Sequence, residues 1–360
     1  MKDNQSRNST ITIIVMCAIV FLVFTFCYIY LYQAESLAYL QHTLSQGKTH
    51  YERTIGAVII TTLAVLLQYA VFRITGLRKR GHALTYFPSV LGLTVLTDVR
   101  ACGYVSHFWI WLAPLLLVAW AALAWVFKQF ETYEPGMDNP GIFSRIMWIN
   151  LLSMAAMLVF MITCSNSNEV LHHRLRIENM VVKAKYEKAL EVGRKSLEND
   201  SSLTMLRFYA LARAGKAGEE FFKYPVSDGK SALLLPDGQS TKTLMMNPKI
   251  IKAFSQKKGR ADYQLMGYLL DRDLDGFAKT IGQYYDTDST VIPRHYREAL
   301  VLYTHLRQHR VLTYHDAVLD ADYEDMKKLL KKIPDRAQRE SAVRDTYGNT
   351  YWCYYFRREG

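Results

Sequence analysis

Two histidines have the spacing of a metal-binding pair. His305 and His309 stand four residues apart in the segment HLRQH, a spacing that can place two imidazoles on one face of a helix. A metalloprotease of this pattern also needs a glutamate beside the first histidine, and arginine and glutamine occupy the middle of this segment. The sequence offers no evident third ligand. We therefore interpret both residues as exposed helical histidines and expect no metal site here.

Other patterns resemble sites without completing them. His172 and His173 are adjacent, so on a helix their side chains would point about 100° apart, and we interpret them as interfacial. Asp271, Asp273 and Asp275 alternate like the start of a calcium loop, but no glutamate closes the loop, and a helical turn fits the surrounding apolar spacing better. The sequence contains neither a glycine-rich phosphate loop nor a nucleophile elbow. We therefore expect no catalytic residues, no cofactor and no enzymatic activity.

The two halves of the chain differ in composition. Residues 1–164 are apolar and carry few charges, whereas residues 165–360 have the composition of a soluble helical domain. The net charge of +11 is spread over both halves, which favours solvated faces and membrane-flanking bases over nucleic-acid binding. The five cysteines are scattered, without metal-ligand spacing, and we expect them to be free thiols.

Five apolar stretches in the first half are candidates for membrane spans. The last of them has about twenty residues without a charge after Arg145, which is the length that crosses about 30 Å of hydrocarbon. The first is longer than the apolar part of a signal peptide and lacks a small-residue cleavage site, so we interpret it as an uncleaved span. We expect spans at residues 10–32, 55–74, 83–99, 106–127 and 143–164, which together make a transmembrane domain over residues 1–165.

The third stretch decides the topology. It is short and contains Pro88 and Gly92, so we expect a kinked span, and the alternative is a re-entrant or interfacial segment. The basic residues 78–80 and those of the N-terminus place both segments in the cytoplasm of a bacterium, with the chain in the inner membrane. Five crossings would put the tail in the periplasm, and four would leave it in the cytoplasm. The flanking Lys and Arg residues satisfy either topology.

Few polar residues lie inside the spans. Ionisable groups within a membrane usually mark a transport path, but the spans hold only Gln68, Asn150 and some hydroxyl residues, with Asp98 at an edge. We expect an anchor. The alternative is a membrane-embedded transporter or enzyme with a regulatory tail, which would be sensitive to substitution at these three positions.

The second half has helical periodicity. The segment YEKALEVGRKSLENDS, residues 186–201, resembles the second helix of a tetratricopeptide repeat, and residues 206–222 resemble a first helix and the start of a second. Residues 262–285 resemble a complete helix–turn–helix, with Gly267 where a small residue lets two helices approach. Residues 223–247 interrupt the series with glycine and proline. We expect an all-α protein in which a soluble tetratricopeptide-like α-solenoid, residues 166–360, follows the transmembrane domain.

Three short sequence segments together resemble one particular protein family. They are Tyr86-Phe87-Pro88-Ser89, the segment PRHYREAL at residues 293–300, and Thr350-Tyr351-Trp352. The chain looks like an uncharacterised family of bacterial polytopic membrane proteins with a repeat-like helical tail. The members generally have more spans, so the resemblance implies that this chain is a reduced version. It implies architecture and no activity.

The tail is where we expect a partner to bind. Stacked helix pairs form a concave surface on which aromatic and arginine side chains anchor extended peptides. The candidate residues are Tyr209, Arg213, Tyr263, Tyr284, Tyr296, Tyr303 and Trp352. The alternative is that these aromatic side chains pack in the core of the tail. We expect a scaffold or assembly factor that contacts the lipid bilayer and a protein or peptide partner, but no nucleic acid.

Overall fold

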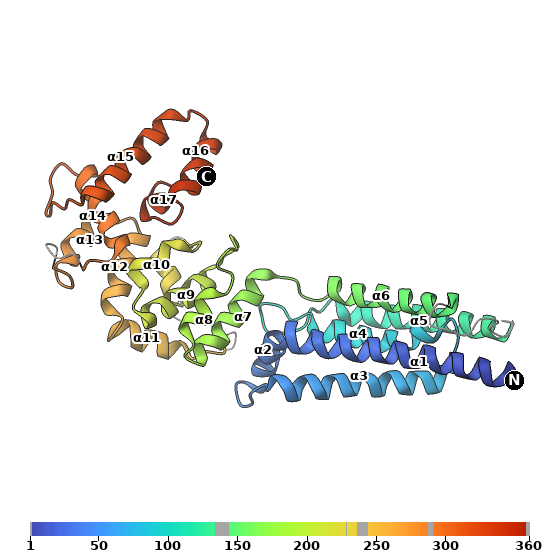
Figure 1. Ribbon diagram of the computed structural model, residues 1–360. Helices are drawn as coiled ribbons and strands as arrows, with labels where there is room; N and C mark the ends of the chain where they lie inside the picture. The colour runs from blue at the N-terminus through green and yellow to red at the C-terminus, as the bar shows by residue number, and fades with distance from the viewer. Residues whose placement is uncertain (1, 134–143, 228, 236–243, 287–290, 358–360) are drawn as a thin grey trace. The chain divides into compact units, whose positions relative to one another are not determined.

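Helices are the regular secondary structure of the computed structural model, which describes residues 2–133, 144–227, 229–235, 244–286 and 291–357. Within these ranges the only extended pairing is an isolated bridge between Val99 and Val105. Contacts divide the chain into two units, Met1–Asn168 and Glu169–Gly360 (Figure 1). The division falls after Asn168, against an expected boundary after residue 165.

Four segments of the first unit are long and apolar enough to cross a membrane. They are Ile11–Tyr32, Arg53–Thr75, Trp109–Glu131 and Arg145–Cys164. The helices that contain them are α1 (Lys2–Cys27) with the π-helical turn Tyr28–Tyr32, α3 (Arg53–Thr75), α5 (Trp109–Tyr133) and α6 (Arg145–Cys164). They lie side by side as a bundle in Figure 1. Many of their large apolar side chains face outward, as hydrocarbon around the bundle would require. These helices indicate a membrane protein.

The third apolar stretch is not one of these four segments. It forms a 3₁₀ helix, His82–Tyr86, followed by α4, Phe87–Thr97. Pro88 lies in the first turn of α4, where its missing N–H costs no hydrogen bond, so it begins a helix and does not kink one. The 11 residues of α4 extend about 16 Å, too short to cross hydrocarbon alone. With the 3₁₀ helix, at about 2 Å per residue, the stretch extends about 26 Å.

Asn150 satisfies backbone groups before and inside this stretch. Its side chain is fully buried in α6, and its Oδ1 accepts a hydrogen bond from the Ala83 amide at 2.8 Å. Its Nδ2 donates to the carbonyl oxygens of Lys79 and Ile146, both at 2.9 Å. Unpaired backbone groups within hydrocarbon cost several kcal/mol each. Asn150 therefore holds the start of the third stretch against α6.

Two further side chains bind the same stretch. Gln68 of α3 donates from Nε2 to Thr85 Oγ1 at 3.0 Å. The indole of Trp120 in α5 donates to the Leu84 carbonyl oxygen at 2.8 Å. The 3₁₀ helix is thus hydrogen-bonded to three neighbouring helices, so its irregular backbone is satisfied by protein.

Polar contacts join the end of α3 to the end of α5. Lys128 Nζ donates to the Thr75 carbonyl oxygen at 2.8 Å, and the Glu131 carboxylate accepts a hydrogen bond from the Lys79 amide at 2.7 Å. Because both helices end at the same end of the bundle, they run in the same direction. The chain between them must therefore return to the other end of the bundle, and residues 82–97 make that return.

The opposite end of the bundle gathers the ends of α1, α4 and α6. The Tyr28 hydroxyl lies 3.5 Å from Thr97 Oγ1 and donates to Ser165 Oγ at 2.8 Å. Asn166 donates to the carbonyl oxygen of Val99. Within the unit, helices α1, α4 and α6 thus run one way, and α3 and α5 run the other.

The second unit has one continuous core. Its α-helices are α7 (Glu169–Val182), α8 (Tyr186–Glu191), α9 (Ser201–Ala214), α10 (Ala217–Glu220), α11 (Pro248–Gln256), α12 (Arg260–Leu270), α13 (Leu274–Ile281), α14 (Arg294–Leu306), α15 (Ala317–Lys332), α16 (Arg336–Tyr347) and α17 (Tyr351–Phe356), with 3₁₀ turns at Phe221–Lys223 and Lys230–Leu233. One cluster of buried apolar side chains extends from α7 to α17. The tail is therefore a single packed unit.

The first repeat-like segment is less regular than its sequence predicts. The segment 186–201 resembles the second helix of a repeat, but its helix ends at Glu191. Gly193 has a φ of +60°, and a Cβ there would lie 2.6 Å from His173 Nδ1. Arg207 Nη2 donates to the Gly193 carbonyl oxygen at 3.1 Å. A left-handed glycine fixed in this way cannot continue a helix, so the prediction of a longer helix was wrong.

The second repeat-like segment does form a helix pair, α12 and α13. Asp273 caps α13 by accepting a hydrogen bond from the Gly276 amide at 2.8 Å. The close approach expected at Gly267 occurs at Gly276, where a Cβ would lie 2.7 Å from the Tyr268 ring. A Cβ at Gly267 would instead lie 3.5 Å from Cβ of Lys230. Gly267 therefore faces the 3₁₀ turn before α11, and residues of that turn line a groove beside α12.

Candidate partner-binding groove

A groove of about 760 Å³ follows α12. Its lining includes Leu233, Leu234 and Leu235 together with Tyr263 and Tyr268 of α12. Leu233 and Tyr263 are buried, while Leu234 is 37% exposed. The groove therefore presents an apolar surface that a ligand can reach.

The two ends of the groove carry different charged groups, an arginine at one end and two aspartates beside Lys230 at the other. Arg260 lies at the start of α12, and Asp271 and Asp273 follow its end. Eleven residues separate Arg260 from Asp271, which is about 16 Å along a helix. Lys230 holds the acidic end in place, because its amide donates to Asp271 Oδ1 at 2.8 Å and its Nζ lies 3.4 Å from Oδ2. An extended peptide of about five residues has this length.

Five of the seven predicted partner-binding residues lie in the core. Tyr209, Tyr263, Tyr296, Tyr303 and Trp352 are each at most 8% exposed. Their rings pack against other aromatic side chains, as for Tyr209 and Phe254, whose centroids are 5.4 Å apart. A ring with so little exposed surface cannot anchor a partner, so the expectation of an accessible surface is corrected for these five. Core packing, the alternative interpretation, describes them.

The other two predicted residues are more accessible. Arg213 is exposed, and its guanidinium lies over the rings of Tyr186 and Phe254 at 5.3 and 5.1 Å. Tyr284 is partly buried and donates from its hydroxyl to Gln264 Oε1 at 2.9 Å. Gln264 lines the groove. Of the seven predicted residues, only the buried Tyr263 lines the groove; Tyr284 contacts the lining residue Gln264, and Arg213 does not line it.

Sequence reasoning missed most of the groove. Its leucines lie in the segment that was interpreted only as an interruption of the repeats, and Asp271 and Asp273 were weighed as calcium ligands. The run LLL at residues 233–235 beside a turn was the available signal. Pairing that run with α12 requires a contact across about thirty residues, which the sequence pattern does not give.

Among the residues that the structure describes, the others that the sequence suggested for metal binding or a role in the membrane do not form a site. Helix α14 ends at Leu306, so His309 lies beyond it and the helical pair does not form. His305 Nε2 lies 2.9 Å from Asp320 Oδ1. In the described ranges, no group of three or more His, Cys, Asp or Glu residues could hold a metal ion. Asp98, a candidate of the membrane half, accepts a hydrogen bond from the Trp109 indole at 2.8 Å.

A buried ionic network joins two of the three sequence segments that resemble one protein family. Glu298 and His295 of α14 are both fully buried. Glu298 Oε1 accepts a hydrogen bond from Arg294 Nε at 2.8 Å, and Oε2 lies 2.9 Å from His295 Nδ1. Oε2 also accepts from the Tyr351 amide at 2.8 Å, and the Trp352 indole donates to the Glu298 carbonyl oxygen at 2.8 Å. The segments 293–300 and 350–352 therefore form one structural unit that holds α17.

A second buried carboxyl makes the stability of the tail depend on pH. Burial raises the pKa of Glu178 to about 7, against smaller lowering effects from the Met246 amide bond and the Arg174 charge. Between about pH 4.5 and 7 the folded state holds a proton that the unfolded state has released. The free energy of unfolding should therefore fall as pH rises through this window, by at most about 1.4 kcal/mol per pH unit, and level off above it.

Thermal unfolding at pH 5.5 and pH 8 measures this effect. The Glu178→Gln variant keeps an oxygen that can accept the Met246 amide bond, found at 2.8 Å, but has no titrating proton. We expect the native chain to be more stable at pH 5.5 and the variant to lose most of that difference. An equal pH dependence in both proteins would show that another group is responsible.

Taken together, the fold defines an all-helical protein with candidate membrane helices and a helical tail. Residues 238–358 match the model of a family of unknown function, DUF6057. This region covers about a third of the chain and includes α11–α17 with the Glu298 network. The match confirms the resemblance to an uncharacterised family and brings no activity with it. No curated protein matches the chain, and no solved structure does.

Proposed function

We propose that the protein is a membrane-anchored scaffold whose helical tail binds an extended segment of a protein partner along α12. The observation that carries this proposal is the groove itself, with an apolar wall between a cationic and an acidic end. Such a site would favour a peptide with an apolar residue at its centre, an acidic group near Arg260 and a basic group near Asp273. The α12–α13 pair supports a tetratricopeptide-like solenoid as the architecture of this tail.

We further propose five membrane crossings. The support is the common direction of α3 and α5, which requires residues 82–97 to traverse the bundle between them. Bases gather in the sequence near one end of the bundle: Lys2, Arg7, Arg73, Arg78, Lys79, Arg80, Lys128 and Arg145. Near the opposite end the bases of the first unit are Lys48, Arg53 and Arg100. By the positive-inside rule the first end is cytoplasmic, which would place the tail in the periplasm of a bacterial inner membrane.

The alternative, a membrane-embedded transporter or enzyme with a regulatory tail, depends on three polar residues. Gln68, Asn150 and Asp98 each have a hydrogen-bond partner within the membrane unit. These bonds give each residue a structural reason to be present. No observation therefore favours the alternative, and the scaffold is the function that we propose.

Photo-crosslinking from the groove tests the scaffold proposal. A photoreactive amino acid at Leu234, which is 37% exposed, would be compared with the same residue at Leu306, which is 39% exposed and lies outside the groove. We expect a discrete protein adduct from position 234 alone, and we expect Asp273→Lys to weaken it severalfold. Equal adducts from both positions, or no adduct above detergent controls, would count against the groove as the binding site.

A further inference from the structure

A second groove lies in the membrane unit, beside helix α2 (Ala34–Ser45). This helix follows the π-helical turn at the end of α1 and precedes α3. The Tyr39 hydroxyl donates to the Ala101 carbonyl oxygen at 2.8 Å, which fixes α2 to the connection between α4 and α5. The helix thus lies at the end of the bundle where α1 ends and α5 begins.

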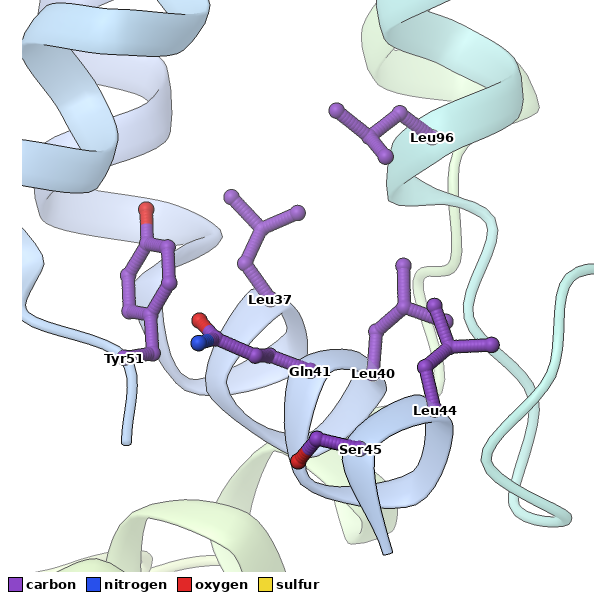
Figure 2. A pocket seen from close by; sticks show the side chains of 7 residues that line it. All are labelled: Leu37, Leu40, Gln41, Leu44, Ser45, Tyr51 and Leu96. Atoms are coloured by element: carbon purple, nitrogen blue, oxygen red, sulfur yellow. The ribbon is translucent and has the colours of Figure 1, made fainter. Parts of the chain in front are cut away.

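The walls of this groove are almost entirely apolar. Figure 2 shows Leu37, Leu40 and Leu44 of α2 on one side of the space and Leu96 of α4 on the other. The groove has a volume of about 410 Å³. Leu44 is 66% exposed, although it belongs to the apolar wall. An apolar hollow of this kind binds water poorly and hydrocarbon well.

The surroundings of the groove indicate what fills it. Leu31 at the end of α1 and Ile55 at the start of α3 are 65% and 60% exposed, so the outward-facing apolar surface of the candidate membrane helices extends to this level. The polar side begins directly beyond α2, where Lys48 and His50 are exposed. The groove therefore opens where membrane hydrocarbon meets the polar interface.

We propose that this groove binds one acyl chain of a bilayer phospholipid. The chain would lie between α2 and Leu96, with its head group at the rim formed by Gln41 and Ser45. The Lys48 amide donates to the Ser45 carbonyl oxygen at 3.1 Å, so a residue with a positively charged, exposed side chain begins beside this rim. A lipid phosphate is attracted to such a charge at the membrane surface.

Lipid photolabelling tests this site in the full chain. The protein would be reconstituted in vesicles of phosphatidylethanolamine and phosphatidylglycerol that contain a trace of phosphatidylglycerol with a diazirine on its acyl chain. Mass spectrometry would compare adducts on residues 34–51 with adducts on α5. We expect the first segment to be labelled more strongly per residue, because a bound chain stays beside it.

Matched variants separate a bound lipid from the surrounding bilayer. Leu44→Asn removes part of the groove wall, whereas Leu31→Asn changes a leucine of equal exposure outside the groove. We expect the first variant to lower labelling of residues 34–51 by roughly threefold or more and the second to leave it unchanged. Equal losses, labelling no stronger than on α5, or a crosslink between two copies through this segment would overturn the proposal.

Discussion

Replacing Glu298 by alanine should unfold the C-terminal end of the tail. The Glu298 carboxylate accepts hydrogen bonds from Arg294 Nε and the Tyr351 amide, and it lies beside the buried His295. Removing one partner of a buried ionic network costs about 3–5 kcal/mol, because the remaining groups stay buried without a counter-charge. Hydrogen exchange of α17 in the full chain measures the effect. We expect the exchange of residues 351–356 to become at least a hundredfold faster.

A surface pair with the same spacing provides the control. Arg336 Nε lies 2.9 Å from Glu340 Oε1, again four residues apart on one helix, but both side chains are more than half exposed. Glu340→Ala should therefore change stability by less than about 0.5 kcal/mol. Glu298→Gln retains one acceptor oxygen and should have an intermediate effect. Unchanged exchange of α17 in Glu298→Ala would contradict the role assigned to the network.

Replacing Asn150 by leucine should destabilise the membrane unit. The substitution leaves the Ala83 amide and the Lys79 carbonyl without the bonds that Asn150 supplies at 2.8 and 2.9 Å. The Lys79 carbonyl keeps a hydrogen bond from the His82 amide at 3.3 Å, so the Ala83 amide is the buried group that loses its partner, and we expect a loss of about 1–3 kcal/mol. Size-exclusion chromatography after heating in detergent measures the loss as a lower temperature of aggregation.

Thr163→Val is the matched control on the same helix. The printed partners of the Thr163 hydroxyl all belong to α6 itself, namely the carbonyl oxygens of Val159 and Phe160 and the sulfur of Cys164, so its removal leaves no group of another segment without a partner. We expect the control to aggregate at the native temperature. If Asn150→Leu were equally stable, Asn150 would be free for a functional role, and the transporter alternative would gain support.

The sequence was sufficient to predict the long helices. Charge-free runs of about twenty residues were placed close to the observed boundaries, because span length follows directly from bilayer thickness. The α12–α13 pair was also predictable, since its apolar spacing and the turn at Arg272 are local signals. Pro88 was misinterpreted as a kink because the 3₁₀ helix before it, which makes Pro88 a first-turn residue, depends on neighbouring helices.

The candidate site was less predictable. Tyrosines on a helical stripe are compatible with either a surface or a core, and the core of the tail is assembled from helices far apart in the chain. The contact between Glu298 and Tyr351 spans 53 residues. Neither periodicity nor residue type identifies such a pair. Both residues lie in segments that resemble one protein family. The hydrogen bond between the two segments gives a physical reason for their joint occurrence in the chain.

The most direct test of a membrane-anchored tail opposite the N-terminus is the side of the membrane that the tail occupies. Alkaline phosphatase and fluorescent-protein fusions after Asn166 and at Gly360 would report this in a bacterial host. Five crossings predict active phosphatase and no fluorescence at both positions. Fluorescent fusions without phosphatase activity would show that residues 82–97 do not cross. That result would contradict the proposed topology and place the partner of the tail in the cytoplasm.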